Sequence, residues 1–132
     1  MSRIAVHSDN APAAVGPYSQ AIVTDPYVYL AGQTPIDPAT GTLVDGGIIA
    51  QTERVFDNLF AVLAAAGLTP DDVVKVNCYL TDLAADFAEM NAVYKARFDA
   101  PYPARTTVGV AALPVGASVE IELVARKKPL PF

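Results

Sequence analysis

The order of hydrophobic and polar positions divides the chain into short strands and two helices. Alternation with a period of two is typical of strands with one buried face. The predicted strands are 3–7, 21–24, 27–31, 43–44, 73–80, 105–111 and 119–125. Between them, apolar residues recur every three or four positions over 48–66 and again over 83–98, which predicts two amphipathic helices.

Turn and cap residues mark where these elements end. Asp25 and Pro26 predict the turn of a hairpin between the second and third strands. Gly67 stands where a left-handed cap would end the first helix, and Asp82 can cap the second. The apolar stripe of the second helix begins at Leu83, so we expect this residue to be buried.

The order of the elements predicts an α+β fold in which both helices cover one face of a largely antiparallel or mixed sheet. One domain is expected to span residues 1–132, with an irregular tail over 126–132 because that segment holds two prolines. Hydrophobic residues make up 52% of the chain and charged residues 17%, which implies much apolar surface. We therefore expect three or more copies to close around the open face of the sheet.

Charge and cysteine content narrow the function classes. A net charge of -5 gives no electrostatic support for nonspecific binding to nucleic acid or to an anionic membrane. The single cysteine, Cys78, excludes an internal disulfide, and its alternating strand predicts a core residue. No cluster of Cys and His could hold zinc, and we expect a cytoplasmic protein without a metal or a membrane span.

The last two predicted strands carry the candidate chemistry. A short connection around Pro114 predicts that they are neighbours in a hairpin. Arg105 would then face Glu120 or Glu122 across the ladder. This grouping has two interpretations, a solvated ion pair on the sheet surface or an anion site in which the guanidinium binds a carboxylate through two hydrogen bonds.

Several short motifs, in order over nearly the whole chain, resemble those of one known family. They are Ala11-Pro12, Gly16-Pro17-Tyr18-Ser19-Gln20-Ala21, Gly32-Gln33, Asp37-Pro38-Ala39-Thr40-Gly41, Asn91 with Tyr94, Pro103-Ala104-Arg105, and Val119-Glu120-Ile121-Glu122. Together they resemble the RidA family, also called YjgF/YER057c/UK114. The resemblance implies a chorismate-mutase-like α+β fold, with two helices on one face of a mixed, mostly antiparallel sheet, and a homotrimer with clefts between subunits.

The resemblance also implies an activity. Family members of this kind hydrolyse 2-iminobutanoate or 2-iminopropanoate, released by pyridoxal-phosphate enzymes, to the 2-oxo acid and ammonia without a cofactor. By this resemblance Arg105 holds the substrate carboxylate, while Glu120 and a main-chain carbonyl near Thr107 position the attacking water. Imine hydrolysis needs a held electrophilic carbon, a water and a proton, so a small set of polar groups is sufficient.

Further residues match pocket positions of the family. Tyr18, Gly32 and Asn91 match such positions, although packing, tight backbone geometry and a bond to the backbone are their respective ordinary interpretations. The chain departs from the family pattern at two places. Many relatives carry Ser where this chain has Ala31, which removes a hydroxyl contact, and some carry Cys where it has Thr107.

Two other functions stay open at the level of sequence. An endoribonuclease activity is attached to the name of the family, but RNA cleavage usually requires paired acid and base groups and a basic track. This acidic chain has one histidine, His7, which we expect at the surface, and one basic cluster at 126–128. The other alternative is a protein without catalysis, either a regulatory trimer that binds a small 2-oxo acid in the same clefts or a holdase-like surface protein.

Overall fold

The computed structural model describes residues 2–127. Its helices are α1 (Ile48–Ala65) and α2 (Leu83–Arg97), with short 3-10 turns η1 (Pro70–Asp72) and η2 (Pro114–Gly116). The main sheet contains β1 (Ile4–Val6), β2 (Ala21–Val23), β3 (Tyr27–Gln33), β6 (Val73–Leu80), β7 (Ala104–Gly109) and β8 (Val119–Arg126). A small second sheet pairs β4 (Ile36–Asp37) with β5 (Thr42–Leu43).

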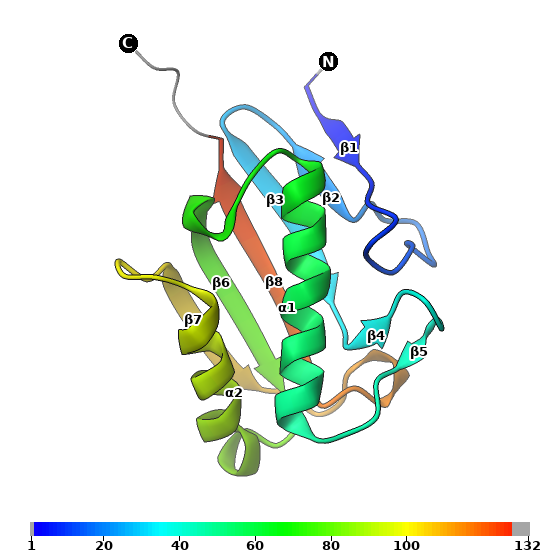
Figure 1. Ribbon diagram of the computed structural model, residues 1–132, viewed down its shortest axis with the longest axis vertical. Coiled ribbons are helices and arrows are strands. Elements are labelled where there is room, and N and C mark those ends of the chain that lie inside the picture. The colour runs from blue at the N-terminus through cyan, green and yellow to red at the C-terminus, as the bar shows by residue number, and fades with distance from the viewer. Residues whose placement is uncertain (1, 128–132) are drawn as a thin grey trace.

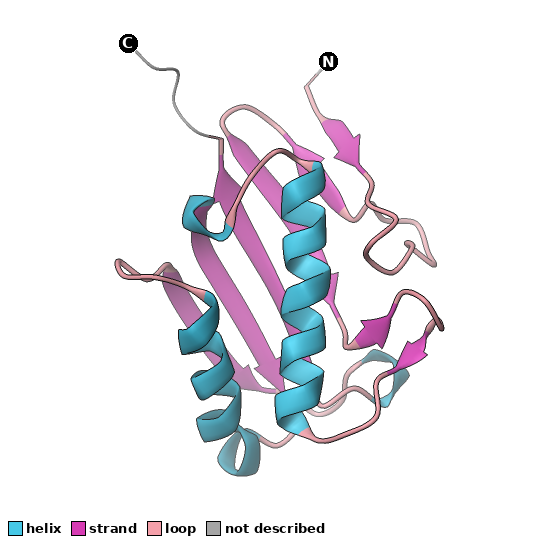
Figure 2. Ribbon diagram, in the orientation of Figure 1, coloured by secondary structure: helices cyan, strands magenta, loops and turns pink. Residues whose placement is uncertain are grey.

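Both helices lie on one face of the main sheet, as the element order predicts (Figures 1 and 2). The core lies between the helices and the sheet, where α1 buries Phe56 and Leu59. From the sheet, β6 contributes Val76, Cys78 and Leu80, all of which are fully buried. The predicted α+β fold is confirmed, and so is the assignment of Cys78 to the core.

The second helix buries a shorter stripe than its sequence predicts. Met90 and Tyr94 are buried on α2, whereas Leu83 is 39% exposed. Leu83 lies against Gly109, the last residue of β7, and β7 is the edge strand of the sheet. The expectation that Leu83 is buried is wrong because the sheet ends beneath it.

The order of strands in the main sheet is β1-β2-β3-β8-β6-β7. Strand β6 pairs with β7 in parallel and with β8 antiparallel, so the predicted hairpin of β7 and β8 is wrong. A parallel pair is possible here because α2 carries the chain back between β6 and β7. The connection after β7 then crosses the end of β6, where Val110 N donates to Leu80 O at 2.8 Å and Thr81 N donates to Ser118 O at 3.1 Å.

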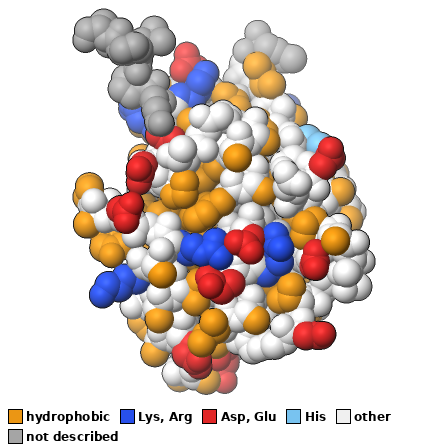
Figure 3. All heavy atoms as spheres, viewed as in Figure 1, with side chains coloured by type: hydrophobic (Ala, Val, Ile, Leu, Met, Phe, Trp, Pro, Cys, Tyr) orange, Lys and Arg blue, Asp and Glu red, His pale blue; other side chains and the backbone are white. Residues whose placement is uncertain are grey.

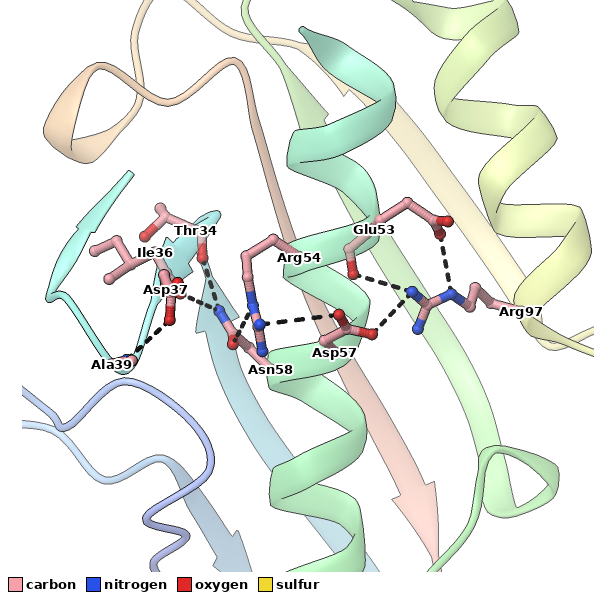
Figure 4. Close-up of polar contacts among 9 residues, drawn as sticks. All are labelled: Thr34, Ile36, Asp37, Ala39, Glu53, Arg54, Asp57, Asn58 and Arg97. Atoms are coloured by element: carbon pink, nitrogen blue, oxygen red, sulfur yellow. Dashed lines mark hydrogen bonds and ion pairs between the residues drawn. The ribbon is translucent and has the colours of Figure 1, made fainter. Parts of the chain in front are cut away.

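The small β4–β5 hairpin is attached to α1 by a buried amide. Asn58, fully buried on α1, donates from Nδ2 to the main-chain oxygens of Thr34 at 3.3 Å and Ile36 at 2.9 Å (Figure 4). Arg54 Nε donates to Asn58 Oδ1 at 3.0 Å. Thr34 and Ile36 follow β3, where the chain leaves the main sheet. The bonds from Asn58 satisfy their main-chain oxygens and so fix the position of the hairpin.

Charged side chains form a band across the helical face of the molecule (Figures 3 and 4). Arg97 of α2 donates to Glu53 Oε1 at 3.1 Å and to Asp57 Oδ1 at 2.9 Å, both on α1. Its guanidinium carbon lies 5.8 Å and 5.7 Å from the ring centroids of Phe56 and Phe60. The band therefore joins the two helices on the side away from the sheet.

The other face of the main sheet carries exposed aromatic and aliphatic side chains. Tyr29 is 48% exposed and Val108 is 40% exposed, and the register places both on the face opposite the helices. Polar groups lie among them, and Tyr79 Oη donates to Glu122 Oε1 at 3.1 Å. Closure of several copies around this face stays a prediction.

The C-terminal strand is longer than predicted. Arg126 still belongs to β8 and pairs with Tyr27, and Lys127 N donates to Pro26 O at 2.7 Å. The expectation of an irregular segment from residue 126 is thus wrong for Arg126, and residues 128–132 of that segment lie outside the described part of the chain. Within residues 2–127, neither helix is long and apolar enough to cross a membrane.

Candidate active site

Arg105 lies on the helix-facing side of β7, where α2 fixes its guanidinium. Its Nη1 donates to Asn91 Oδ1 at 2.7 Å. The guanidinium carbon lies 4.5 Å from the ring centroid of Tyr94 and 5.6 Å from that of Phe87. An arginine held over aromatic faces keeps its planar fork in one orientation.

A hollow of about 400 Å³ opens beside this guanidinium. Its lining residues are Asn91, Tyr94, Lys95, Tyr102, Pro103 and Arg105. Among residues 2–127, no carboxylate forms an ion pair with Arg105. The site therefore offers a half-buried cation with free donors to a small anion.

Buried polar groups lie on the same side of the sheet. Thr107 Oγ1 and Tyr94 Oη are buried without a hydrogen-bond partner in the described part of the chain. Burial raises the pKa of the Cys78 thiol to about 11, although the charge of Arg105 acts in the opposite direction. Burial likewise raises the pKa of Tyr94 to about 12. Cys78 is thus a neutral thiol at pH 7, and nucleophilic catalysis by a thiolate has no support.

Glu120 lies in a second hollow, of about 380 Å³, together with Tyr18, Ala31 and Gly32. Its carboxylate packs so closely against Gly32 that a Cβ at that position would collide with Glu120 Oε2. A bulge in β3 between Leu30 and Gln33 shifts the pairing with β8 at this point. The lack of a side chain at Gly32 therefore allows the carboxylate of Glu120 to occupy this position.

The environment of Glu120 disfavours its charged form. Burial raises the pKa of the Glu120 carboxyl above its ordinary value, and the negative charge of Glu122 raises it further. A carboxyl with a raised pKa holds a proton closer to neutral pH, which suits a group that exchanges protons with water or with a leaving nitrogen.

The two hollows lie on opposite faces of the sheet, which corrects the predicted pairing of Arg105 with Glu120 or Glu122. Val76 of β6 stands opposite Arg105 on one side and opposite Leu123 on the other. Residues directly opposite share a face, so Arg105 shares the face of Leu123, and the two glutamates point the other way. Because β6 separates the two strands, the surface ion pair is absent as well.

The predicted site residues thus fall into two groups. Arg105, Asn91 and Thr107 lie on the helical side, while Tyr18, Ala31, Gly32 and Glu120 lie together in the second hollow. Sequence reasoning missed the stacking role of Phe87. It also missed Val15, Ile36 and Val115, which line the second hollow. Loop residues such as Val115 give no periodic signal, so the pattern could not have revealed them.

Comparison with known proteins assigns the family. A family model described as Endoribonuclease L-PSP matches residues 8–127. Protein DfrA of Myxococcus xanthus is 53% identical over 127 residues, which cover 95% of this chain and 96% of DfrA. The 2-iminobutanoate/2-iminopropanoate deaminase of Capra hircus is 44% identical over 125 residues, which cover 95% of this chain and 90% of that protein. The chain belongs to the RidA family.

The fold agrees with this assignment. The solved structure of RidA from the Antarctic bacterium Psychrobacter matches with a TM-score of 0.89 and 50% identity, covering 93% of this chain and 98% of that one. Two helices on a mostly antiparallel mixed sheet are thus the RidA fold. Among the described residues of this RidA protein, no group of three His, Cys, Asp or Glu side chains could hold a metal ion.

Proposed function

We propose that this protein hydrolyses 2-imino acids, such as 2-iminobutanoate and 2-iminopropanoate, to 2-oxo acids and ammonia. The observation that carries the proposal is the guanidinium of Arg105, which is fixed by Asn91 and Tyr94 beside a hollow and has no carboxylate partner within residues 2–127. The name of the relative from Capra hircus supports the same reaction.

The proposed chemistry uses the two groups in different roles. Two hydrogen bonds from Arg105 hold the substrate carboxylate and so place the adjacent imine carbon. Glu120 orients the water, whose oxygen forms a bond to that carbon. The carbon–nitrogen bond then breaks, the oxygen becomes the carbonyl of the 2-oxo acid, and the nitrogen leaves as ammonia with the protons of the water. No metal or covalent intermediate is required.

The proposed site is assembled from two copies of the chain. Arg105 and Glu120 lie on opposite faces of one sheet, so a single copy cannot present both to one small substrate. Exposed side chains such as Tyr29 and Val108 favour closure of the open sheet face by other copies. We propose a homotrimer in which the hollow at Arg105 of one copy faces the hollow at Glu120 of the next.

A trapping assay tests the proposal. A threonine dehydratase releases 2-iminobutanoate, semicarbazide captures it, and the rate of semicarbazone formation should fall when the protein is present. Arg105→Ala should reduce kcat/KM by roughly 100-fold or more, because it removes a charged group that binds the substrate. Arg3→Ala, at an exposed arginine outside both hollows, is the matched control and should protect as wild type does.

The oligomeric mass of each variant should be measured by light scattering, so that a loss of assembly is not taken for a loss of chemistry. Full protection by Arg105→Ala would refute the assignment. Binding of 2-oxobutanoate by the wild type without turnover would instead favour a regulatory module. Cleavage of RNA that persists in nuclease-free preparations and is lost in Arg105→Ala would favour the activity in the description of the family model.

A further inference from the structure

The hollow beside Glu120 continues into an aliphatic groove. Val15, Ile36 and Val115 line the hollow of about 380 Å³ that contains Glu120. A neighbouring hollow of about 400 Å³ shares Ile36 and Val115 and adds Leu43. We call the surface formed by Val15, Ile36, Leu43 and Val115 the aliphatic groove. It leads from the candidate reaction centre toward the β4–β5 hairpin.

We propose that the aliphatic groove binds the side chain of the imino acid, so that the protein prefers substrates with large apolar side chains, and that Val115 is a specificity-determining residue. This inference rests on the proposed deaminase function. With the carboxylate held by Arg105 of the adjacent copy and the imine carbon beside Glu120, the substituent on that carbon extends into the groove.

The chemistry of the groove supports an apolar occupant. Glu120 is the one charged residue among the described residues that line either hollow. Ala31 provides no hydroxyl where it borders the hollow. Tyr18, Thr34 and Thr42 are the uncharged residues with polar side chains in the lining, and the four residues of the groove itself are aliphatic, so an apolar substrate side chain would bury surface favourably there.

The wall of the groove is fixed. Ile36 belongs to β4, and its main-chain oxygen accepts a hydrogen bond from the buried Asn58 at 2.9 Å. The carbonyl of Thr34, the residue that precedes this short strand by two positions, accepts a second bond from the same amide. A wall held in this way discriminates by size and polarity better than a mobile loop, because it does not rearrange around a poor fit.

The backbone of Val115 is a second, independent observation. This residue has φ 57° and ψ 18°, a left-handed conformation that branched side chains rarely adopt. Its side chain is also 60% exposed, so burial in the core does not explain it. Asparagine or glycine would adopt this conformation with less strain. A strained valine at the mouth of a hollow points to a role for its side chain.

The test compares two imines made by the same reaction. An L-amino acid oxidase converts leucine or alanine to the corresponding 2-imino acid, with oxygen as the electron acceptor, and semicarbazide competes for each product. For the wild type, kcat/KM for the imine from leucine should exceed that for the imine from alanine by at least about tenfold, which is the lower end of the discrimination that one extra methylene group gives in a hydrophobic pocket.

The decisive variant is Val115→Asn, which suits a left-handed backbone and removes the aliphatic surface. It should lower the ratio of the two kcat/KM values by roughly three- to tenfold without lowering the Tm. Val115→Leu, which keeps an aliphatic side chain at this position, should retain most of the wild-type ratio of the two kcat/KM values. Ile49→Asn is the matched control, because Ile49 is a 49% exposed aliphatic residue of α1 outside both hollows, and it should leave the ratio unchanged.

Two outcomes separate this inference from the proposed function. Equal kcat/KM values for both imines, with no change in Val115→Asn, would overturn the inference and leave the deaminase in place. Failure of the wild type to hydrolyse either imine would overturn both.

Discussion

At the scale of single residues, the candidate site depends on groups that position the reacting side chains. Asn91 and Tyr94 fix the guanidinium of Arg105 through a hydrogen bond and a stacked ring. On the other side of the sheet, the absence of a side chain at Gly32 allows the carboxylate of Glu120 to lie against the backbone. Substitutions of these supporting residues therefore test the site as directly as substitutions of Arg105 and Glu120.

Gly32→Ala should displace the carboxylate of Glu120, because the added Cβ would collide with Glu120 Oε2. We expect kcat/KM for 2-iminobutanoate to fall by about tenfold to 100-fold, as a displacement of about 1 Å can cause. Gly47→Ala is the control, since a Cβ there meets no atom within 4 Å. Equal activity of the two variants would show that the position of the carboxylate is unimportant.

The raised pKa of Glu120 predicts how stability depends on pH. A carboxyl whose pKa is higher in the folded than in the unfolded protein favours folding when protonated, and this contribution is lost as the pH rises from about 4.3 through the folded pKa. Glu120→Gln removes the ionisation. Its Tm should equal or exceed that of the wild type at pH 7, and the difference should shrink toward pH 4.

Glu89→Gln, at an exposed position of α2, is the control for the loss of one charge. A Tm difference between Glu120→Gln and wild type that grows as the pH falls would contradict the assigned direction of the pKa shift.

At the scale of elements, α1 positions a wall of the candidate site as well as the core. Its buried stripe packs on the sheet, while Asn58 on the same helix holds the β4–β5 hairpin through the carbonyls of Thr34 and Ile36. A buried amide that satisfies two main-chain groups is costly to remove, because both acceptors then lose their partner.

Asn58→Ala should therefore lower the free energy of unfolding by about 1–3 kcal/mol, measured by urea denaturation. It should also loosen the hairpin and so reduce discrimination between large and small imines. Asp57→Ala, at the neighbouring exposed residue that pairs with Arg97 at 2.9 Å, should cost about 1 kcal/mol or less. Similar losses in both variants would show that the buried amide has no special role.

At the scale of the whole molecule, the sheet separates the two groups that the proposed reaction needs. Arg105 and Glu120 reach one substrate only if a second copy supplies one of them. Oligomerisation would then complete the active site, in addition to covering exposed side chains such as Tyr29.

Mixed oligomers of Arg105→Ala and Glu120→Gln test this arrangement. Each variant alone should be inactive. In an equal mixture, a site is intact when a Glu120→Gln subunit supplies Arg105 and the adjacent Arg105→Ala subunit supplies Glu120. This combination occurs at about one site in four, so about a quarter of the wild-type activity should return. The measurement is the trapping assay on co-expressed, doubly tagged protein. No recovery in oligomers shown to contain both variants would place the complete site within one copy.

The sequence by itself determined where both helices and the longer strands lie and, apart from residues such as Leu83, which of their residues face the core. Those features depend on local periodicity, which is why the stripe of α1, the burial of Cys78 and the α+β class could be predicted. The separate roles of Arg105 and Glu120 could be suggested only through the family motifs.

Only the tertiary structure decided the order of the strands. Alternation of apolar and polar residues indicates the two faces of a strand but not its neighbours in the sheet. The pattern therefore predicts a hairpin of β7 and β8, whereas β6 lies between them in the structure. The registers of β7 and β8 on β6 place Arg105 and Glu120 on opposite faces, and these registers depend on pairing between residues far apart in the chain. The left-handed backbone of Val115, in the loop between β7 and β8, is likewise a feature that only the structure reveals.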